Sequence, residues 1–228
     1  MNKTIRIALV GAKGQMGRAI VAAAKDQPNL GIAVECDVGD ALEDKISQAD
    51  VIIDFSHADT VSKICSIARR FQIAVVIGTT GHTAEQKRLI EAAGTKIPIV
   101  YASNFSVAVN VLFDIAAKAS QLLGRDFNVR IVETHHTRKK DAPSGTAKTL
   151  AEVIKAARRT EEPVTIESIR EGDVVGDHTV FLSGPGEELE LTHRASSREI
   201  FALGALRAAQ WVVDQKPGLY SMRDVLGL

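Results

Sequence analysis

Ile5–Val10 (IRIALV) and Gly11–Gly17 (GAKGQMG) follow one another near the amino terminus. The first stretch is apolar except for Arg6, which predicts a buried strand. The second has the spacing G-x-x-G-x-x-G and leads into apolar residues at helical spacing, namely Met16, Ile20, Ala23 and Ala24. A strand, a glycine turn and a helix in this order are typical of a dinucleotide-binding unit, because the glycines let a pyrophosphate approach the helix N-terminus.

The glycine spacing alone is weak support, because Lys13 stands where the common G-x-G-x-x-G pattern has its middle glycine. Tight packing without a ligand is the alternative. A second predicted strand, Gly31–Glu35, favours a dinucleotide, because Glu35 stands at the spacing of about 20 residues at which an acidic side chain binds the adenosine ribose. The cofactor residues expected here are Gly11, Ala12, Lys13, Gly14, Gln15, Met16 and Glu35.

Strands and helices then alternate along the chain. Apolar strands are predicted at 51–55, 74–77 and 98–101, helices at 60–71 and 83–93, and a polar linker with one helical turn at 37–50. This alternation predicts an α/β fold with a Rossmann-like, doubly wound parallel sheet.

Ligands of such sheets bind beyond the carboxyl ends of the strands, where two polar loops follow, 78–81 (GTTG) and 102–106 (ASNFS). Ordinary turn chemistry is the alternative for both loops. We expect these loops to contribute further cofactor residues: Gly78, Thr79, Thr80, Ala102, Ser103, Asn104 and Phe105.

Glu133–Lys148 (ETHHTRKKDAPSGTAK) is the richest stretch in reactive side chains. It follows a predicted strand at 129–132 and enters a helical apolar pattern, so 144–146 form a helix N-terminus whose unpaired N–H groups suit an anion. His135, His136 and Lys139 can exchange or donate protons. Together these groups suit an anionic substrate that undergoes proton transfer. Taken singly, these groups are better explained by helix capping, a structural histidine pair and a solvated basic face. Their joint occurrence within sixteen residues favours the functional explanation.

The remaining pattern predicts a second, α+β domain. A long apolar helix is expected at 107–123, and strands with alternating polarity are expected at 163–166, 178–182 and 188–193. Glycine-rich turns separate these strands, which indicates a mixed or antiparallel sheet. A final apolar helix opens at Ser197-Arg198 and includes Trp211, which we expect to be a core residue.

The pattern E-x-H-H-x-x-K-x-D-x-P-S-G-T from Glu133 to Thr146 resembles the signature of the 4-hydroxy-tetrahydrodipicolinate reductase family, also called dihydrodipicolinate reductase, of bacterial lysine and diaminopimelate biosynthesis. The glycine turn, Glu35 and both loop motifs fit the same resemblance. It implies a discontinuous dinucleotide-binding domain of 1–106 and 199–228, and a substrate-binding and oligomerisation domain of 107–198 that builds a homotetramer.

The resemblance also implies the chemistry. The expected reaction reduces a cyclic, unsaturated dicarboxylate to tetrahydrodipicolinate with hydride from a nicotinamide cofactor. His135 and Lys139 are the expected catalytic residues, because the hydride acceptor also needs a proton. The expected substrate-binding residues are His136, Lys139, Ser144, Gly145 and Thr146. We expect no metal, since an adjacent histidine pair is a poor chelate.

The end of the second strand predicts the cofactor. Glu35 can accept hydrogen bonds from ribose hydroxyls, whereas a 2′-phosphate would meet its negative charge. The following residues, Cys36 and Asp37, supply no compensating cation, and we expect Lys13 and Arg18 to point at the pyrophosphate. NADH is therefore expected to be preferred over NADPH, with use of NADPH left open.

Bulk composition bounds the remaining choices. The 228 residues suffice for two domains, and 28 Lys and Arg against 28 Asp and Glu leave no global positive field for nucleic acid or an anionic membrane. Cys36 and Cys65 suggest no disulfide framework, which fits a reducing cytoplasm. The apolar run 5–11 is too short to span a membrane, and Arg6 argues against a secretory signal.

Two rival functions remain at this stage. Another two-domain nicotinamide enzyme, such as an aspartate or homoserine dehydrogenase, would keep the glycine turn but would not need the histidine and lysine motif. A non-catalytic dinucleotide sensor would bind the cofactor and never oxidise it. Oxidation of the cofactor by the cyclic imine separates the three.

Overall fold

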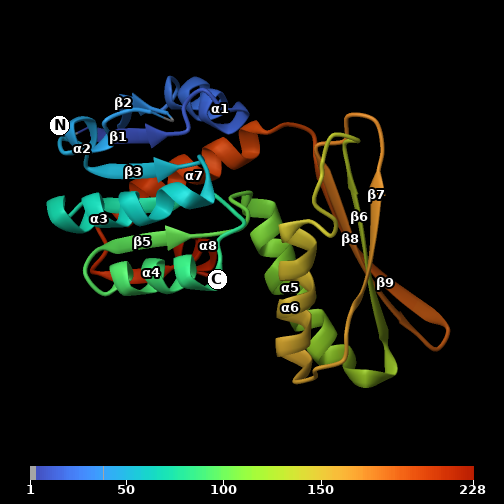
Figure 1. Cartoon of the computed structure of the whole chain (residues 1–228). Helices are drawn as coiled ribbons and strands as arrows, with labels where there is room; N and C mark the ends of the chain where they lie inside the picture. Colours follow the sequence, from blue (N-terminus) through green and yellow to red (C-terminus); the bar gives the residue numbers. More distant parts are fainter. Residues whose placement is uncertain (1–3, 38) are drawn as a thin grey trace. The chain divides into compact units, whose positions relative to one another are not determined.

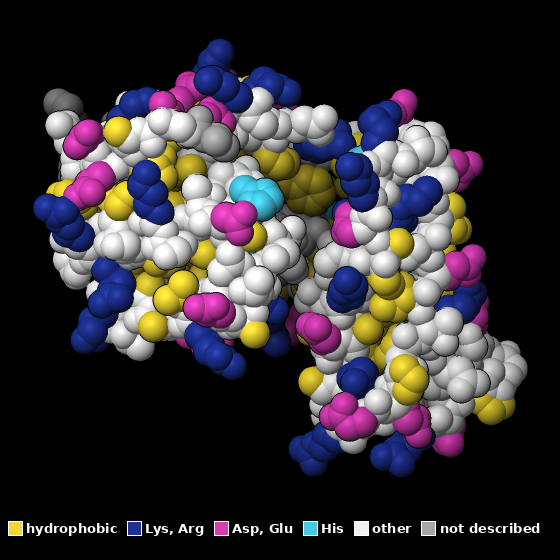
Figure 2. Space-filling view, viewed as in Figure 1, with side chains coloured by type: hydrophobic (Ala, Val, Ile, Leu, Met, Phe, Trp, Pro, Cys, Tyr) yellow, Lys and Arg dark blue, Asp and Glu magenta, His cyan; other side chains and the backbone are white. Residues whose placement is uncertain are grey.

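The computed structural model describes residues 4–37 and 39–228, which form two compact units (Figure 1). The first runs to Ser106 and resumes over Glu199–Gly227, and the second spans Val107–Arg198. On the face drawn in Figure 2, Lys and Arg side chains are interspersed with Asp and Glu side chains over both units, as the balanced composition predicts.

The first unit is built on a parallel sheet in the strand order β10-β5-β4-β3-β1-β2. Its strands are β1 (Ile5–Val10), β2 (Leu30–Cys36), β3 (Val51–Asp54), β4 (Ala74–Ile77), β5 (Pro98–Tyr101) and β10 (Gly218–Tyr220). Its helices are α1 (Gln15–Ala24), α2 (Leu42–Ile46), η1 (Ala58–Thr60), α3 (Val61–Phe71), α4 (Ala84–Gly94), α7 (Glu199–Val212) and α8 (Met222–Leu226). The predicted Rossmann-like doubly wound sheet is confirmed.

Two apolar cores cover the two faces of this sheet. Successive strand residues point to opposite faces, so Ile7 and Leu9 join one core with α1 and α7, while Ala8 and Val10 join the other with α2, α3 and α4. Burial on both sides explains why β1, β3 and β4 are almost continuously apolar. Cys65 is buried on α3.

The C-terminal segment completes the first unit in a way that the sequence pattern did not predict. Gly218–Tyr220 forms a strand that pairs in parallel with β5, with Leu219 opposite Ile99. Three residues are too few to show strand periodicity, and they are extended because the edge of β5 is available for pairing. Trp211 lies against this core with its ring 5.1 Å from the ring of Tyr220.

The second unit combines a mixed sheet with two helices, as predicted. The strand order is β7-β6-β8-β9, with β6 and β7 parallel and the other pairs antiparallel. The elements are α5 (Val107–Leu123), η2 (Gly124–Asp126), β6 (Asn128–His135), α6 (Gly145–Arg158), β7 (Thr165–Arg170), β8 (Gly176–Gly184) and β9 (Glu187–Ala195). Apolar residues of α5 and α6 bury one face of the sheet.

The predicted strand at 163–166 is wrong in its position. The observed β7 begins at Thr165 and continues through a polar run to Arg170. Pro163 has no N–H for a ladder, while pairing with β6 holds the polar residues extended. This register places Arg170 opposite His135.

One helical stretch among the described residues, Val107–Asp126, is long and apolar enough by length and composition to span a membrane. Its apolar residues have a different explanation here. Val109, Leu112, Phe113 and Ala116 are buried in the core of the second unit, and the core helix of a soluble protein passes the same test.

Gly204→Ala should destabilise the first unit, because a Cβ at this position of α7 would lie 1.8 Å from the carbonyl oxygen of Phe105. We expect a loss of about 1–3 kcal/mol or more in the free energy of unfolding, measured by urea denaturation with Trp211 fluorescence. In Gly31→Ala the added Cβ would only touch Thr4 at 3.5 Å, so this control should change stability by about 0.5 kcal/mol or less. Equal stability of the two variants would contradict the close helix packing.

Candidate functional site

The glycine turn lies at the point where the strand order of the first sheet reverses. From β1, the sheet continues through β2 on one side and through β3, β4 and β5 on the other. Ligands of doubly wound sheets bind in the crevice outside the carboxyl ends of strands at such a reversal. The loops after β1 and β3 therefore form the candidate cofactor site.

A pocket of about 540 Å³ opens at this edge of the sheet. It brings together six of the predicted cofactor residues, Gly14, Gln15, Met16, Gly78, Thr79 and Thr80. Gly81, the last residue of the predicted GTTG loop, also lines the pocket. The sequence reasoning missed the other lining residues, which are Phe55, Ser56, His57, Ala58, Asp59, Thr83 and Gln86. The first five directly follow β3, and the rule that predicted the loops after β4 and β5 would have selected them as well.

Glycine is required in the turn for steric reasons. Gly11 has φ of 87°, and a Cβ there would lie 2.4 Å from the carbonyl oxygen of Phe55. A Cβ on Gly17 would lie 2.2 Å from the carbonyl oxygen of Gly11. Gly14 is the N-cap of α1 and provides no side-chain cap, so the first-turn N–H groups of this helix have no capping side chain.

Gly11, Ala12 and Lys13 lie beside the pocket rather than in its lining. The backbone N–H groups of Gly11 and Ala12 donate to the carbonyl oxygen of Cys36, which ties the turn to the end of β2. The N–H of Lys13 donates to Oδ2 of Asp37 at 3.0 Å. Arg18 does not extend freely either, because its guanidinium donates to the carbonyl oxygen of Lys13.

The end of β2 places Glu35 and Asp37 differently from Cys36. Glu35 is exposed, as a ribose-binding residue needs to be. Cys36 is fully buried in the core that the sheet forms with α2, α3 and α4. Burial raises the pKa of its thiol. The side chain at position 36 therefore cannot meet a ribose phosphate, and the carboxylate next to the glycine turn is that of Asp37.

The loop after β5 does not line the pocket. Ser103 is exposed, and the side chain of Asn104 accepts a hydrogen bond from the N–H of Ser106 at 2.8 Å. Phe105 is almost fully buried, with its ring 5.6 Å from that of Phe55. Phe105 supports the adjacent β3 loop from within the core, and Ala102 continues the backbone pairing with β4.

In the second unit, His135 is the last residue of β6 and belongs to a buried polar cluster. Its Nδ1 lies 3.0 Å from Oε2 of Glu133, which is fully buried. The other carboxylate oxygen of Glu133 accepts from Nη2 of Arg170 at 3.0 Å and from the N–H of Ser144 at 3.2 Å. Burial alone would raise the pKa of Glu133, yet these donors hold it well below its usual range.

His178 of β8 is a member of this cluster that the sequence did not indicate. Its ring centroid lies 5.1 Å from that of His135, and its Nε2 is 3.3 Å from Oγ of Ser144. Burial, together with the nearby His135, lowers the pKa of His178 to about 3. His178 is therefore neutral, and only the antiparallel pairing of β8 with β6 brings it to the site.

The loop after β6 positions Lys139 and His136. The ammonium group of Lys139 lies 2.8 Å from Oδ1 of Asp141, and the Lys139 N–H donates to the carbonyl oxygen of His136 at 3.0 Å. Burial opposes ionisation of Asp141, but Lys139 keeps its pKa below the usual value. His136 is partly exposed, and burial with neighbouring Arg138 lowers its pKa.

The predicted helix N-terminus is formed by Ser144, Gly145 and Thr146. Ser144 is the N-cap of α6, and its Oγ accepts from the N–H of Ala147 at 3.1 Å. Because the same Oγ also contacts His178, the hydroxyl of Ser144 is engaged within the protein. The anion-binding capacity therefore rests on the backbone N–H groups of the first turn.

Glu133, His135 and His178 also form a possible metal-binding cluster, with ligand atoms within 4.8 Å of one another. Arg170 places a cation 3.0 Å from the same carboxylate. A metal ion in this cluster would lie near that guanidinium, and the repulsion between the two cations disfavours metal binding.

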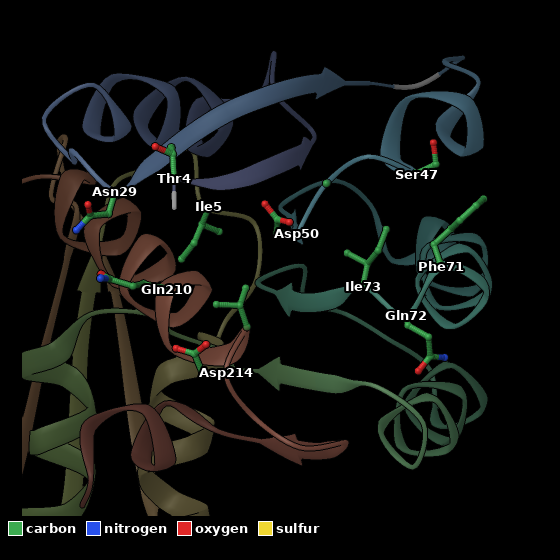
Figure 3. A pocket seen from close by; sticks show the side chains of 12 residues that line it. Thr4, Ile5, Asn29, Ser47, Asp50, Phe71, Gln72, Ile73, Gln210 and Asp214 are labelled. Carbon is green, nitrogen blue, oxygen red and sulfur yellow. The ribbon is translucent and has the colours of Figure 1, made fainter. Parts of the chain in front are cut away.

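A second, larger pocket of about 670 Å³ occurs in the first unit (Figure 3). It lies at the amino ends of the strands, next to Ile5 of β1 and to Asp50, which directly precedes β3. Asp50 already forms an ion pair with Arg6 at 3.0 Å. Since dinucleotides bind at the opposite edge of such sheets, this pocket is not the cofactor site.

The fold, the pocket beside the glycine turn and the polar cluster of the second unit define a Rossmann-type dinucleotide-binding protein with a second, α+β unit. Residues 5–105 match the family described as "Dihydrodipicolinate reductase, N-terminus", and residues 108–226 match "Dihydrodipicolinate reductase, C-terminus". The chain belongs to the dihydrodipicolinate reductase family.

Similar proteins agree with this assignment. The chain is 45% identical to a 4-hydroxy-tetrahydrodipicolinate reductase of Akkermansia muciniphila, covering 98% of both chains. It is 41% identical to the enzyme of that name from Hahella chejuensis, covering 98% of this chain and 99% of the relative. Among solved structures, a dipicolinate-bound dihydrodipicolinate reductase from Paenisporosarcina sp. TG-14 shares the fold, with a TM-score of 0.81, 23% identity and coverage of 96% of this chain and 97% of that one.

The neutral state of His178 predicts a pH-dependent stability. Unfolding restores a pKa near 6.5, so below that pH the unfolded chain binds a proton that the folded chain excludes until about pH 3. Stability should fall with decreasing pH, and His178→Gln should remove up to about 1.4 kcal/mol per pH unit of that slope between pH 6.5 and pH 5.

The measurement is urea denaturation followed by circular dichroism at several pH values. His57→Gln is the matched control, because the side chain of His57 is 77% exposed and should leave the slope unchanged. An unaltered slope in His178→Gln would show that His178 binds protons equally in the folded and the unfolded protein, so that folding does not lower its pKa.

Proposed function

We propose that this chain reduces 4-hydroxy-tetrahydrodipicolinate to tetrahydrodipicolinate with a nicotinamide cofactor, in the diaminopimelate and lysine pathway. The observation that carries the proposal is the joint placement of His135, Lys139 and the N-terminus of α6 on one loop of a family member. Proton donors and an anion-binding helix end are what reduction of a cyclic dicarboxylate requires.

The 4-hydroxyl group of the substrate leaves as water, which creates an unsaturated bond in the ring, and the reduction then adds a hydride and a proton across that bond. The nicotinamide, when bound, supplies the hydride. His135, assisted by Lys139, supplies the proton to the electron-rich product of hydride addition. Lys139 also binds a substrate carboxylate together with His136 and the first turn of α6, where Gly145 leaves room for the ligand. The dipicolinate bound in the related structure is such a ring dicarboxylate.

The glycine turn and the pocket beside it fit a dinucleotide. The first turn of α1 has no capping side chain, so its N–H groups suit a pyrophosphate. Gln15 and Met16, with the loop from Gly78 to Thr80, line the same pocket. We propose Glu35 as the ribose ligand, and Gly11 as a residue that shapes the turn. We also propose that the Ala102–Phe105 loop contributes to the cofactor site. Its support is the family resemblance and the contact of Phe105 with Phe55, which lines the pocket.

The proposed assembly is a homotetramer built through the second unit. Its support is the family resemblance and the edge strand β9, on which Leu189 is 40% exposed. A cytoplasmic location follows from the same resemblance. The first unit, which includes Glu199–Gly227, is the proposed nucleotide-binding domain, and the second unit is the proposed substrate-binding domain.

The rival dehydrogenases share less with the chain. A diaminopimelate dehydrogenase from C. glutamicum has a TM-score of 0.60 with 12% identity, which indicates a common fold alone. No feature of that fold requires the histidine and lysine loop.

The function is tested by loss of nicotinamide absorbance on addition of freshly made 4-hydroxy-tetrahydrodipicolinate. Aspartate semialdehyde and oxaloacetate should give no oxidation. His135→Gln and Lys139→Ala should each lower kcat by about 10²- to 10⁴-fold, the usual contribution of general acid–base catalysis, with cofactor affinity nearly unchanged. Full activity in either variant would remove that residue from the mechanism.

NADH should be used in preference to NADPH by about 10- to 100-fold in kcat/KM, a difference of about 1.4 to 2.8 kcal/mol. The reason is the carboxylates of Glu35 and Asp37 beside the expected ribose. Asp37→Asn keeps an oxygen that can accept the hydrogen bond from the Lys13 N–H, but it removes the negative charge. The ratio of kcat/KM for NADH to kcat/KM for NADPH should therefore decrease. Since Cys36 is buried, an arginine there would be buried too and would not test the idea.

Both cofactors are compared at one ionic strength, with the exposed Asp26→Asn as a control for loss of an acidic charge. Equal or better use of NADPH by the unmodified protein would overturn the preference, and would indicate that Lys13 or Arg18 contacts the 2′-phosphate.

A further inference from the structure

Glu133 has no role in the proposed chemistry, although its carboxylate is at the centre of the polar cluster in the second unit. Its side chain is fully buried. Oε1 accepts from Arg170 at 3.0 Å and from the Ser144 N–H at 3.2 Å, and Oε2 lies 3.0 Å from Nδ1 of His135. A buried carboxylate with this many donors is held as the anion.

The position of this anion selects one nitrogen of His135 for chemistry. A carboxylate beside Nδ1 favours a proton on that nitrogen, so Nε2 carries the proton that is exchanged with a ligand. The space around Nε2 is restricted, because a Cβ on Gly176 would approach it to 2.9 Å. The ring of His135 is therefore held between the carboxylate, the backbone of β8 and the ring of His178.

His178 does not compete for the role of acid. It is neutral, and its Nε2 shares a hydrogen bond of 3.3 Å with Oγ of Ser144, which also accepts from the Ala147 N–H. The same cluster thus fixes both the catalytic ring and the N-cap of α6. Arg170 extends it by donating at 2.5 Å to the carbonyl oxygen of Asp141, the residue that pairs with Lys139.

We propose that Glu133 is a positioning residue, which orients the ring of His135 through Nδ1 and aligns it with the N-terminus of α6. This inference rests on the proposed function. It assigns the first residue of the E-x-H-H motif a part in proton transfer rather than only in packing.

Several charged or titratable groups face His135 besides Glu133. His136 and Lys139 belong to the loop that follows it, Arg170 stands opposite it on β7, and His178 lies beside it on β8. His193 of β9 pairs with His178. Glu133 is the acidic residue whose carboxylate lies 3.0 Å from the ring, so its removal should release the ring from this orientation.

The test is Glu133→Gln, which keeps the shape and an acceptor for the Ser144 N–H. We expect kcat to fall about 10- to 100-fold, short of the full contribution of a general acid, with KM for the substrate changed less than about threefold. Glu152→Gln, at an exposed position of α6, makes the same chemical change elsewhere and should leave both quantities unchanged.

A double-mutant cycle separates positioning from packing. If Glu133 acts through His135, Glu133→Gln should cost little in a His135→Gln background, whereas a purely structural role would cost the same in both backgrounds. Circular dichroism, and calorimetric measurement of pyridine-2,6-dicarboxylate binding, show whether each variant is folded. If Glu133→Gln does not fold, Glu133→Gln/Arg170→Gln takes its place in the cycle, because it leaves no partly buried guanidinium without its carboxylate partner.

The outcomes distinguish the two proposals. No cofactor oxidation by the unmodified enzyme would overturn the proposed function. Activity in the unmodified enzyme with additive losses in the cycle would overturn the positioning role alone.

Discussion

Burial of the Glu133 charge is the constraint on which the second unit depends. A carboxylate removed from water is costly unless charged and polar donors surround it. Its donors come from separate segments, namely Arg170 at the end of β7 and the Ser144 N–H at the start of α6. The parallel register of β6 and β7 and the starting point of α6 are therefore coupled to one side chain. The loop between His135 and Ser144, which bears Lys139, is enclosed by these contacts.

The first unit relies on close backbone approach instead. Gly11 and Gly17 let the turn fold against the β3 loop and against itself, and Gly204 lets α7 approach the carbonyl of Phe105. A side chain at any of these positions would meet a backbone oxygen at 2.4 Å or less. The conformation of the loops at the nucleotide-binding edge thus depends on glycines that have no side chain. The conformation of the proposed substrate loop depends on the buried charge of Glu133.

This division suits the two proposed tasks. A pyrophosphate needs backbone N–H groups at short range, which only a turn without side chains offers. Proton transfer needs a titratable ring in one orientation, which fixed neighbours provide. His178 is neutral and Glu133 is ionised, although both side chains are buried. Hydrogen-bond donors around Glu133 compensate its charge, whereas burial of a protonated His178 would cost free energy that the neutral ring avoids.

The sequence by itself determined the elements whose signals are local. Period-two and helical apolar patterns, with glycine spacing, identified the parallel sheet, its helices and the N-cap at Ser144, because these depend on neighbouring residues. Only the tertiary structure decided that Cys36 is buried, that Gly218–Tyr220 pairs with β5, and that His178 and Arg170 lie beside His135. Those features depend on strand register and on contacts between residues far apart in the chain, for which short-range periodicity carries no information.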